Sequence, residues 1–69
     1  DRRRMRILER DGGLCCEHRR QGVAVVAKHV DHIIPKSQGG TDDDGNLQSL
    51  CAACHRAKTA REGRSRGAG

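Results

Sequence analysis

The sequence predicts a small α+β domain, and three features of its 69 residues support that class. Helix formers dominate residues 2–10 and 52–62, near the two ends of the chain. β-Branched residues dominate residues 23–34, and glycines and a single proline separate these stretches. A chain this short buries too little surface to be comfortably stable without an additional stabilising element, such as a bound metal or a partner. We therefore expect one domain that a metal ion or a partner helps to stabilise.

The first expected element is a helix over about residues 2–10, within "DRRRMRILERD". Its short apolar stripe consists of Met5, Ile7 and Leu8. Gly12 and Gly13 end this helix. The segment "VAVVAKHVDHII" then predicts one extended strand or two short strands, because it is rich in β-branched residues and stops at Pro35.

A loop follows, marked by Pro35 and the pair Gly39-Gly40 and continued by "TDDDGN". We interpret its three aspartates, 42–44, as a solvated turn rather than a metal site, with Asp44 or Asn46 capping a short turn. "LQSL" predicts a short strand, and "AACHRAKTARE" predicts a helix that Gly63 closes. Residues 1–62 thus form the expected domain, and residues 63–69 form a basic tail that we expect to be disordered.

The candidate core is aliphatic only, because the chain contains no Phe, Tyr or Trp. Its expected members are Met5, Ile7, Leu8, Leu14, Val23, Val25, Val26, Val30, Ile33, Ile34, Leu47 and Leu50. The same lack of aromatic rings argues against a reader of single strands or RNA, which stacks bases on such rings. A formal net charge of +5 favours a polyanionic partner, so contact with the backbone of a duplex is the preferred mode.

Four cysteines point to a metal rather than to disulfides, since no stretch is apolar and long enough for a membrane span or a signal sequence. The chain begins with Asp1 rather than Met, which fits a fragment of a longer protein and leaves an exported parent open. Structural zinc takes four nitrogen or sulfur ligands, often as two close pairs. The pairs here are Cys15 with His18, in "LCCEHRR", and Cys51 with Cys54. We expect one zinc ion on these four residues.

Cys16 competes with Cys15 as a ligand, but a gap of one residue to His18 is a poorer bite. We expect Cys16 to pack as a small hydrophobic residue or to stay a free thiol. His55 directly follows Cys54, and a helical step of about 100° turns its side chain away from the zinc. His55 is therefore free for another role.

The ordered set "VDHIIP", "GGTDDDGNLQSLC" and "CAACHRAKTARE", preceded by "RILERDGGLC", resembles the His-Asn-His (HNH) endonuclease family over about residues 13–62. The resemblance implies a ββα-metal (His-Me finger) core, which here carries an N-terminal helix and a structural zinc site. It implies that His32 is the general base and that Asp31 and His55 hold one catalytic divalent cation, such as Mg²⁺ or Mn²⁺. Asn46 corresponds to the asparagine that holds the loop beside the base. Many relatives have a cysteine where this chain has His18.

The residue types fit hydrolysis of a phosphodiester independently of the resemblance. A histidine with an ordinary pKa of about 6.5 is a suitable base near neutral pH, and a carboxylate with an imidazole leaves a cation open positions. We expect Arg56, Lys58 and Arg61 to hold flanking phosphates without reading sequence. Asp31 and His32 should face opposite sides of a regular strand, so both reach one site only where the strand ends. His29, on the parity of Asp31, is the rival ligand or base.

The leading hypothesis is a metal-dependent DNA endonuclease, which nicks or cuts both strands. The alternative is a non-catalytic zinc module that docks on nucleic acid; a protein interaction module is disfavoured because the composition provides no sizeable apolar surface. The expected partner is double-stranded DNA, with no membrane, and a homodimer and phage packaging proteins stay open. The resemblance suggests the cytoplasm of a bacterial or phage-infected cell.

Overall fold

A computed structural model describes the backbone of residues 2–67 and the side chains of residues 2–62. The element order is α1 (Arg2–Arg10), α2 (Cys16–Arg20), β1 (His29–His32), β2 (Leu47–Leu50) and α3 (Ala52–Gly67). Two single turns of 3₁₀ helix, Lys36–Gln38 and Asp44–Asn46, lie in the loop between the strands. The small α+β class is confirmed.

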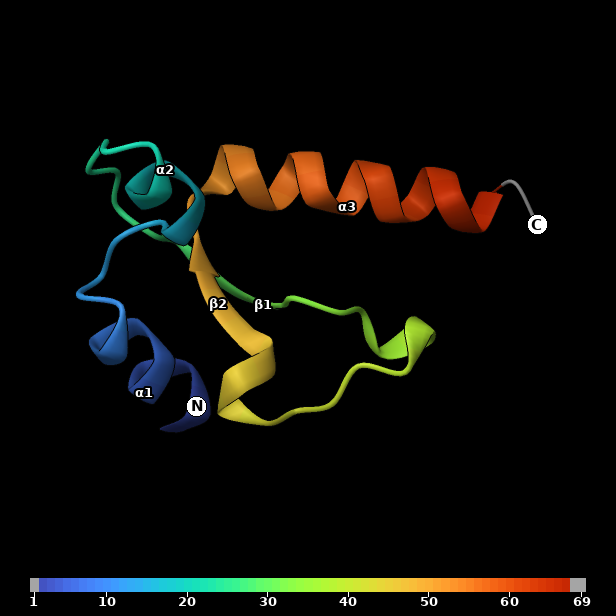
Figure 1. The fold of residues 1–69 in the computed structure, drawn as a ribbon, viewed down its shortest axis with the longest axis horizontal. Coiled ribbons are helices and arrows are strands. Elements are labelled where there is room, and N and C mark those ends of the chain that lie inside the picture. The colour runs from blue at the N-terminus through green and yellow to red at the C-terminus, as the bar shows by residue number, and fades with distance from the viewer. Residues whose placement is uncertain (1, 68–69) are drawn as a thin grey trace.

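The sheet lies between two helices. β1 and β2 pair antiparallel, with His29 opposite Leu50 and His32 opposite Leu47. In Figure 1, α1 lies against one face of this two-stranded sheet and α3 crosses the other face. All four residues of β2 are buried, because helices cover both of its faces. The order β1, β2, α3 is the ββα unit that the resemblance implies.

The helix α1 has the expected bounds, and its end follows from two glycines. Gly12 and Gly13 adopt left-handed φ angles of 65° and 72°, and the amide of Gly13 donates to the carbonyl of Leu8 at 2.8 Å. Only glycine adopts such angles freely, so these two residues stop the helix and turn the chain back over the sheet. The expectation for residues 2–10 is confirmed.

Asp11 joins the end of α1 to β2. Its buried carboxylate accepts the backbone N–H of Ser49 at 3.1 Å and the guanidinium of Arg10 at 2.9 Å. Burial raises the pKa of Asp11, but these hydrogen bonds outweigh burial and bring the pKa to about 2. Arg10 also donates to the carbonyl of Leu47 at 2.8 Å. The polar end of α1 therefore sets where β2 begins.

The core is smaller than expected and includes two cysteines. Its buried apolar side chains are Ile7, Cys15, Ala27, Leu47, Leu50 and Cys51. Five residues expected in the core are exposed by 44–61%: Met5, Val23, Val26, Ile33 and Ile34. That expectation is wrong for them because a two-stranded sheet with short helices covers few positions, and the cysteines fill the centre instead.

Three features of the secondary structure also differ from expectation. Residues 23–28 form no strand beyond a single bridge from Val26 to Leu14, since no second strand continues alongside them. The short helix α2 was not expected. α3 does not close at Gly63 but continues to Gly67, because one glycine costs a helix only about 1 kcal/mol and does not end it alone. Residues 63–67 of the expected tail are thus helical, and residues 68–69 lie outside the described part.

None of the described helices is long and apolar enough to cross a membrane.

Candidate metal centre and active site

The expected zinc ligands converge on one point. The Nδ1 atom of His18 lies 3.4 Å from the sulfur of Cys15, 3.6 Å from that of Cys51 and 3.5 Å from that of Cys54. A tetrahedral zinc ion, with Zn–S bonds of about 2.3 Å and a Zn–N bond of about 2.0 Å, separates such ligands by about 3.5 Å. All four ligand atoms lie within 4.8 Å of one another. The cluster therefore has the size and chemistry to hold a structural zinc ion.

Two short backbone turns bring these ligands together. Cys15 precedes α2, and the amide of Cys15 donates to the carbonyl of Val25 at 2.7 Å, which ties the turn to the next segment. Cys51 precedes α3, and its sulfur accepts the amide of Cys54 at 3.4 Å. Cys51 thus takes the place of an N-cap side chain for α3. The metal cluster and the start of α3 share the same residue.

The thiols of the cluster differ in acidity because they influence one another. Burial raises the pKa of Cys15, but hydrogen bonds with His18 outweigh burial and lower the pKa. The pKa of Cys54 is raised by burial and then by the neighbouring thiols of Cys51 and Cys15. A divalent cation offsets the repulsion among closely spaced thiolates, which is why such clusters bind metal.

Cys16 is not part of the cluster. Its half-buried thiol donates to the carboxylate of Asp11 at 3.3 Å, on the side of α1. Among the residues with described side chains, the four zinc-type ligands are the only group of three or more that could hold a metal ion. The choice of Cys15 over Cys16, made from spacing alone, agrees with this geometry.

Two of the expected catalytic residues, Asp31 and His32, are the last two residues of β1. Side chains alternate along this strand, so His29 and Asp31 share one face and Val30 and His32 share the other. The ring of His29 stacks on that of His55 in α3, with centroids 4.2 Å apart and planes 17° apart. Asp31 and His55 therefore both lie between β1 and α3. His32 is the last residue of β1 and lines a hollow on the α1 side of the sheet, so its side chain leaves the strand on the opposite face from Asp31.

Asp42 holds the ring of His32. The Oδ1 atom of Asp42 lies 2.7 Å from Nε2 of His32, and its Oδ2 atom accepts the ammonium of Lys36 at 3.1 Å. These two hydrogen bonds, the one to His32 first, lower the pKa of Asp42 to about 2. A contact of this kind keeps the proton on Nε2 and leaves Nδ1 as the proton acceptor. Sequence reasoning missed it, because nothing in a run of three aspartates shows which one meets the histidine.

Asn46 clamps the loop to the end of β1. Its Oδ1 atom accepts the amide of Ile34 at 2.8 Å, and its Nδ2 atom donates to the carbonyls of Ile34 at 3.1 Å and Thr41 at 2.7 Å. One side chain thus joins both ends of the long loop just beyond Asp31 and His32. Asn46 caps no helical turn by its side chain; it lies in the second 3₁₀ turn.

Asp44 also has a structural partner. It begins the second 3₁₀ turn, and its carboxylate pairs with Arg6 of α1 at 2.7 Å. The three aspartates of the loop thus bind separate partners, because Asp43 accepts the hydroxyl of Thr41. They do not converge on one point, in agreement with the interpretation of a turn.

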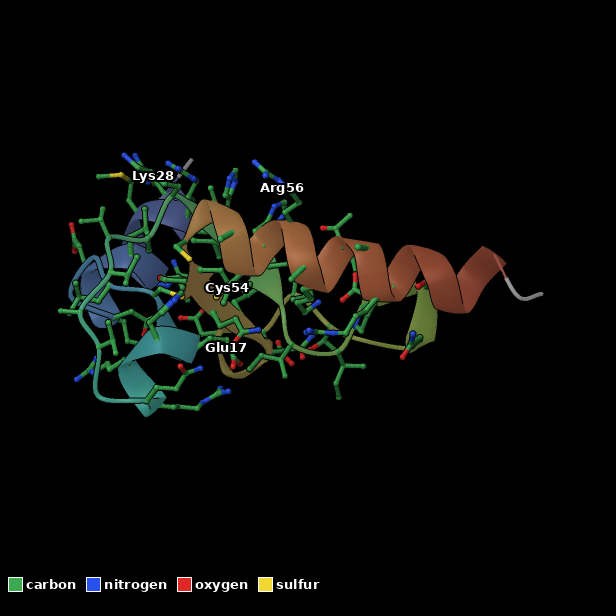
Figure 2. The ribbon with its side chains drawn as sticks, turned by 90° about the horizontal axis from the view of Figure 1, so that it is seen from above. Glu17, Lys28, Cys54 and Arg56 are labelled. Atoms are coloured by element: carbon green, nitrogen blue, oxygen red, sulfur yellow. The ribbon has the colours of Figure 1, made fainter. Side chains whose placement is uncertain are left out.

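The three residues expected to contact phosphates lie in different surroundings. Lys58 is only 9% exposed, and its ammonium contacts Asp31 at 3.4 Å and also Glu62. Arg56 and Arg61 are exposed, but Arg61 lines clefts with Glu17 on one side of α3. Figure 2 shows Cys54 on that same side and Arg56 on the opposite side. The structure therefore does not bring these three residues into one row.

The chain is similar to known proteins in both sequence and fold. The family model described as HNH endonuclease matches residues 14–61. The structure is similar to a crystal structure of the HNH endonuclease of the deep-sea thermophilic bacteriophage GVE2 with a manganese ion. The TM-score is 0.80 at 40% identity, covering 93% of this chain and 72% of that chain.

A curated relative is the DNA annealing helicase and endonuclease ZRANB3 of Bos taurus, 50% identical over 38 residues. These residues are 54% of this chain and 4% of that protein. The chain thus corresponds to a small part of ZRANB3, and the match extends only to that part.

Proposed function

Because the chain belongs to the HNH endonuclease family, we propose that it is a metal-dependent DNA endonuclease that hydrolyses phosphodiester bonds. His32 is the general base, and Asp31 and His55 hold the catalytic divalent cation. The observation that supports this most is the fixed end of β1: Asn46 clamps the loop there and Asp42 holds the ring of His32. A module that only docked on nucleic acid would need neither contact.

His32 acts on the attacking water. With Nε2 bound to Asp42, its Nδ1 atom is the one that takes a proton from water. Asp42 then stabilises the imidazolium that forms, because a carboxylate favours a neighbouring positive charge. The side chain of His32 is 26% exposed, so water can reach it. Asp42 is thus a positioning residue for the base.

Asp31 and His55 form the second part of the site. When bound there, a divalent cation supplies positive charge that stabilises the phosphate in the transition state. Asp31 already directs one carboxylate oxygen at the amide of His32 and the other at Lys58, so its charge is held in a fixed place. His55 lies in the first turn of α3, and its amide donates to the carbonyl of Cys51 at 2.9 Å. The relative solved with manganese supports a divalent ion of this class.

The zinc cluster has a structural role in this proposal. Cys51 and Cys54 fix the start of α3, and His55 is the next residue along the helix. The cluster therefore determines where the imidazole of His55 points, without taking part in the chemistry. A single site cuts one strand per encounter, so we propose nicking for the isolated domain. The phage relative supports action in the cytoplasm of a bacterial or phage-infected cell.

Cleavage of supercoiled plasmid tests the proposal. We expect zinc-loaded wild-type protein to cut the plasmid when Mg²⁺ or Mn²⁺ is added, and His32→Ala to lose at least about 100-fold in rate, since a general base contributes about 10² to 10⁴. Zinc content and circular dichroism should stay unchanged in His32→Ala. His29→Ala removes the ring that stacks on His55 and tests the rival base, and it should lose less activity than His32→Ala.

Two results would contradict the proposal. One is a wild type that leaves the plasmid intact with every divalent ion tried, which would favour the docking module. The other is a His32→Ala protein that cuts as fast as wild type. If His29→Ala rather than His32→Ala abolished cutting, the base would be His29.

A further inference from the structure

Six of the described arginines and lysines are neutralised by a carboxylate of the chain, and six are not. Those with a carboxylate partner are Arg3, Arg6, Arg10, Arg20, Lys36 and Lys58. Those without such a partner among the described residues are Arg2, Arg4, Arg19, Lys28, Arg56 and Arg61. An unpaired surface cation keeps its full charge for an external anion.

Three of these unpaired cations follow one edge of the molecule. Figure 2 shows Lys28 and Arg56 along the same edge, on the opposite side from Glu17. The guanidinium of Arg4 donates to the backbone carbonyl of Lys28 at 2.9 Å, which places Arg4 beside it. All three residues are exposed. We call Arg4, Lys28 and Arg56 the basic strip.

The basic strip passes both halves of the proposed active site. Arg4 lines the hollow that contains the ring of His32. Arg56 lines a shallow hollow of about 430 Å³ that is also lined by His29 and His55, whose rings stack on each other. Lys28 directly precedes His29 in the sequence. No acidic residue lines either hollow, whereas the clefts on the other side of α3 include Glu17. The residues that line these two hollows therefore carry either positive charge or none.

We propose that the basic strip is the track on which the sugar-phosphate backbone of duplex DNA lies, with Lys28 and Arg56 each contacting a phosphate. The inference rests on the proposed nuclease function and names the surface that presents DNA to it. The partner is a duplex rather than a single strand, because the chain has no aromatic side chain on which bases could stack. Arg61, on the far side of α3, lies outside the track.

The salt dependence of binding to a short labelled duplex tests this directly. The zinc-loaded protein is titrated at several salt concentrations with no added divalent cation, and each phosphate contact contributes about 0.9 to the slope of log K against log salt. We expect Lys28→Gln and Arg56→Gln each to reduce the slope by about 0.9, and the double variant by about twice that. Lys28→Arg, which keeps the charge, should retain the slope of wild type.

Arg19→Gln is the matched control, because Arg19 is exposed, unpaired among the described residues, and lies on α2 near Val23, away from the strip. It removes the same charge and should leave the slope unchanged. In plasmid cleavage, Lys28→Gln should raise KM more than it lowers kcat, since a phosphate contact is equally present before and during the reaction.

The strip is refuted if Lys28→Gln and Arg56→Gln bind with the slope of wild type, or if Arg19→Gln reduces the slope as much as they do. Wild type that still cleaves plasmid in that case leaves the proposed nuclease function intact. Wild type that neither binds nor cleaves duplex DNA instead refutes the nuclease function itself, and the strip with it.

Discussion

The candidate zinc cluster and the proposed catalytic region of this chain are built in opposite ways. In the zinc cluster, four ligand atoms face one another within 4.8 Å, and Cys15 and Cys51 are buried. In the proposed catalytic region, each side chain is half-buried and tied to a different neighbour: Asp31 to Lys58, His32 to Asp42 and His55 to His29. A structural site is closed on itself, whereas a catalytic site must leave room for substrate.

The two regions should therefore contribute differently to the stability of the fold. Cys15, Cys51 and Leu50 form a buried cluster, and Cys54 packs against it, so we expect metal binding and folding to be one process there. The catalytic side chains lie outside that cluster and are held by polar contacts across the sheet and the loop. A change in the first region should therefore unfold the protein, and a change in the second should lower activity while the fold persists.

The largest effect is expected from the zinc cluster. Cys51→Ser removes a ligand and the sulfur that caps α3, so we expect loss of bound zinc and of the fold, because a core this small does not hold without its metal. Metal analysis and far-UV circular dichroism measure both. Cys16→Ser is the matched control and should keep one zinc per chain. Retained zinc and fold in Cys51→Ser would rule out the assigned ligand set.

A smaller loss is expected from the loop clamp. Asn46→Ala removes three hydrogen bonds that join the loop to the end of β1. We expect cleavage to fall about 100-fold, the usual result when catalytic groups move by about 1 Å, with zinc content unchanged. Plasmid cleavage and metal analysis on the same sample check this. Gln38→Ala, in the same loop and without a side-chain hydrogen bond among the described residues, should cut like wild type. Equal activity of both variants would remove Asn46 from the account.

The smallest effect concerns Asp11, which belongs to neither proposed ion site. Its pKa in the folded state is about 2, below the ordinary 3.8, so it stabilises the fold above pH about 4 and loses that contribution as pH falls toward 2. The shift corresponds to about 2 kcal/mol of unfolding free energy, which Asp11→Asn should lose above pH 4. Denaturant unfolding of both zinc-loaded proteins at neutral pH measures this difference. Equal unfolding free energies for the two proteins would contradict the assignment.

Much of the fold follows from local sequence signals. The bounds of α1 and β2 were expected, because helix formers ending in two glycines and the run "LQSL" are unambiguous. The exposure of Ile33 and Ile34 was not expected, because hydrophobicity alone does not show that a two-stranded sheet has nothing to cover them. The five-residue α2 carries too short a pattern to be recognised.

The two sites also differ in how much of each could be predicted from the sequence. The spacing of Cys15, His18, Cys51 and Cys54 was enough to predict the zinc cluster, because each pair sits on one tight turn. The partner of His32 could not be predicted, because Asp42 is ten residues away across a loop whose path depends on Asn46. Lys58 was expected to contact phosphates at the surface. Its burial against Asp31 could not be predicted, because it depends on how α3 packs against β1.

The central claim is that the neighbours Cys54 and His55 serve different ions, and one variant tests it most directly. His55→Ala protein should be analysed for zinc and assayed for plasmid cleavage with Mg²⁺ or Mn²⁺ in the same preparation. We predict one zinc per chain, an unchanged circular dichroism spectrum, and cleavage reduced by at least about 100-fold, as expected when a group that holds the catalytic cation is removed. Loss of zinc from His55→Ala, or cleavage at the rate of wild type, would contradict the claim.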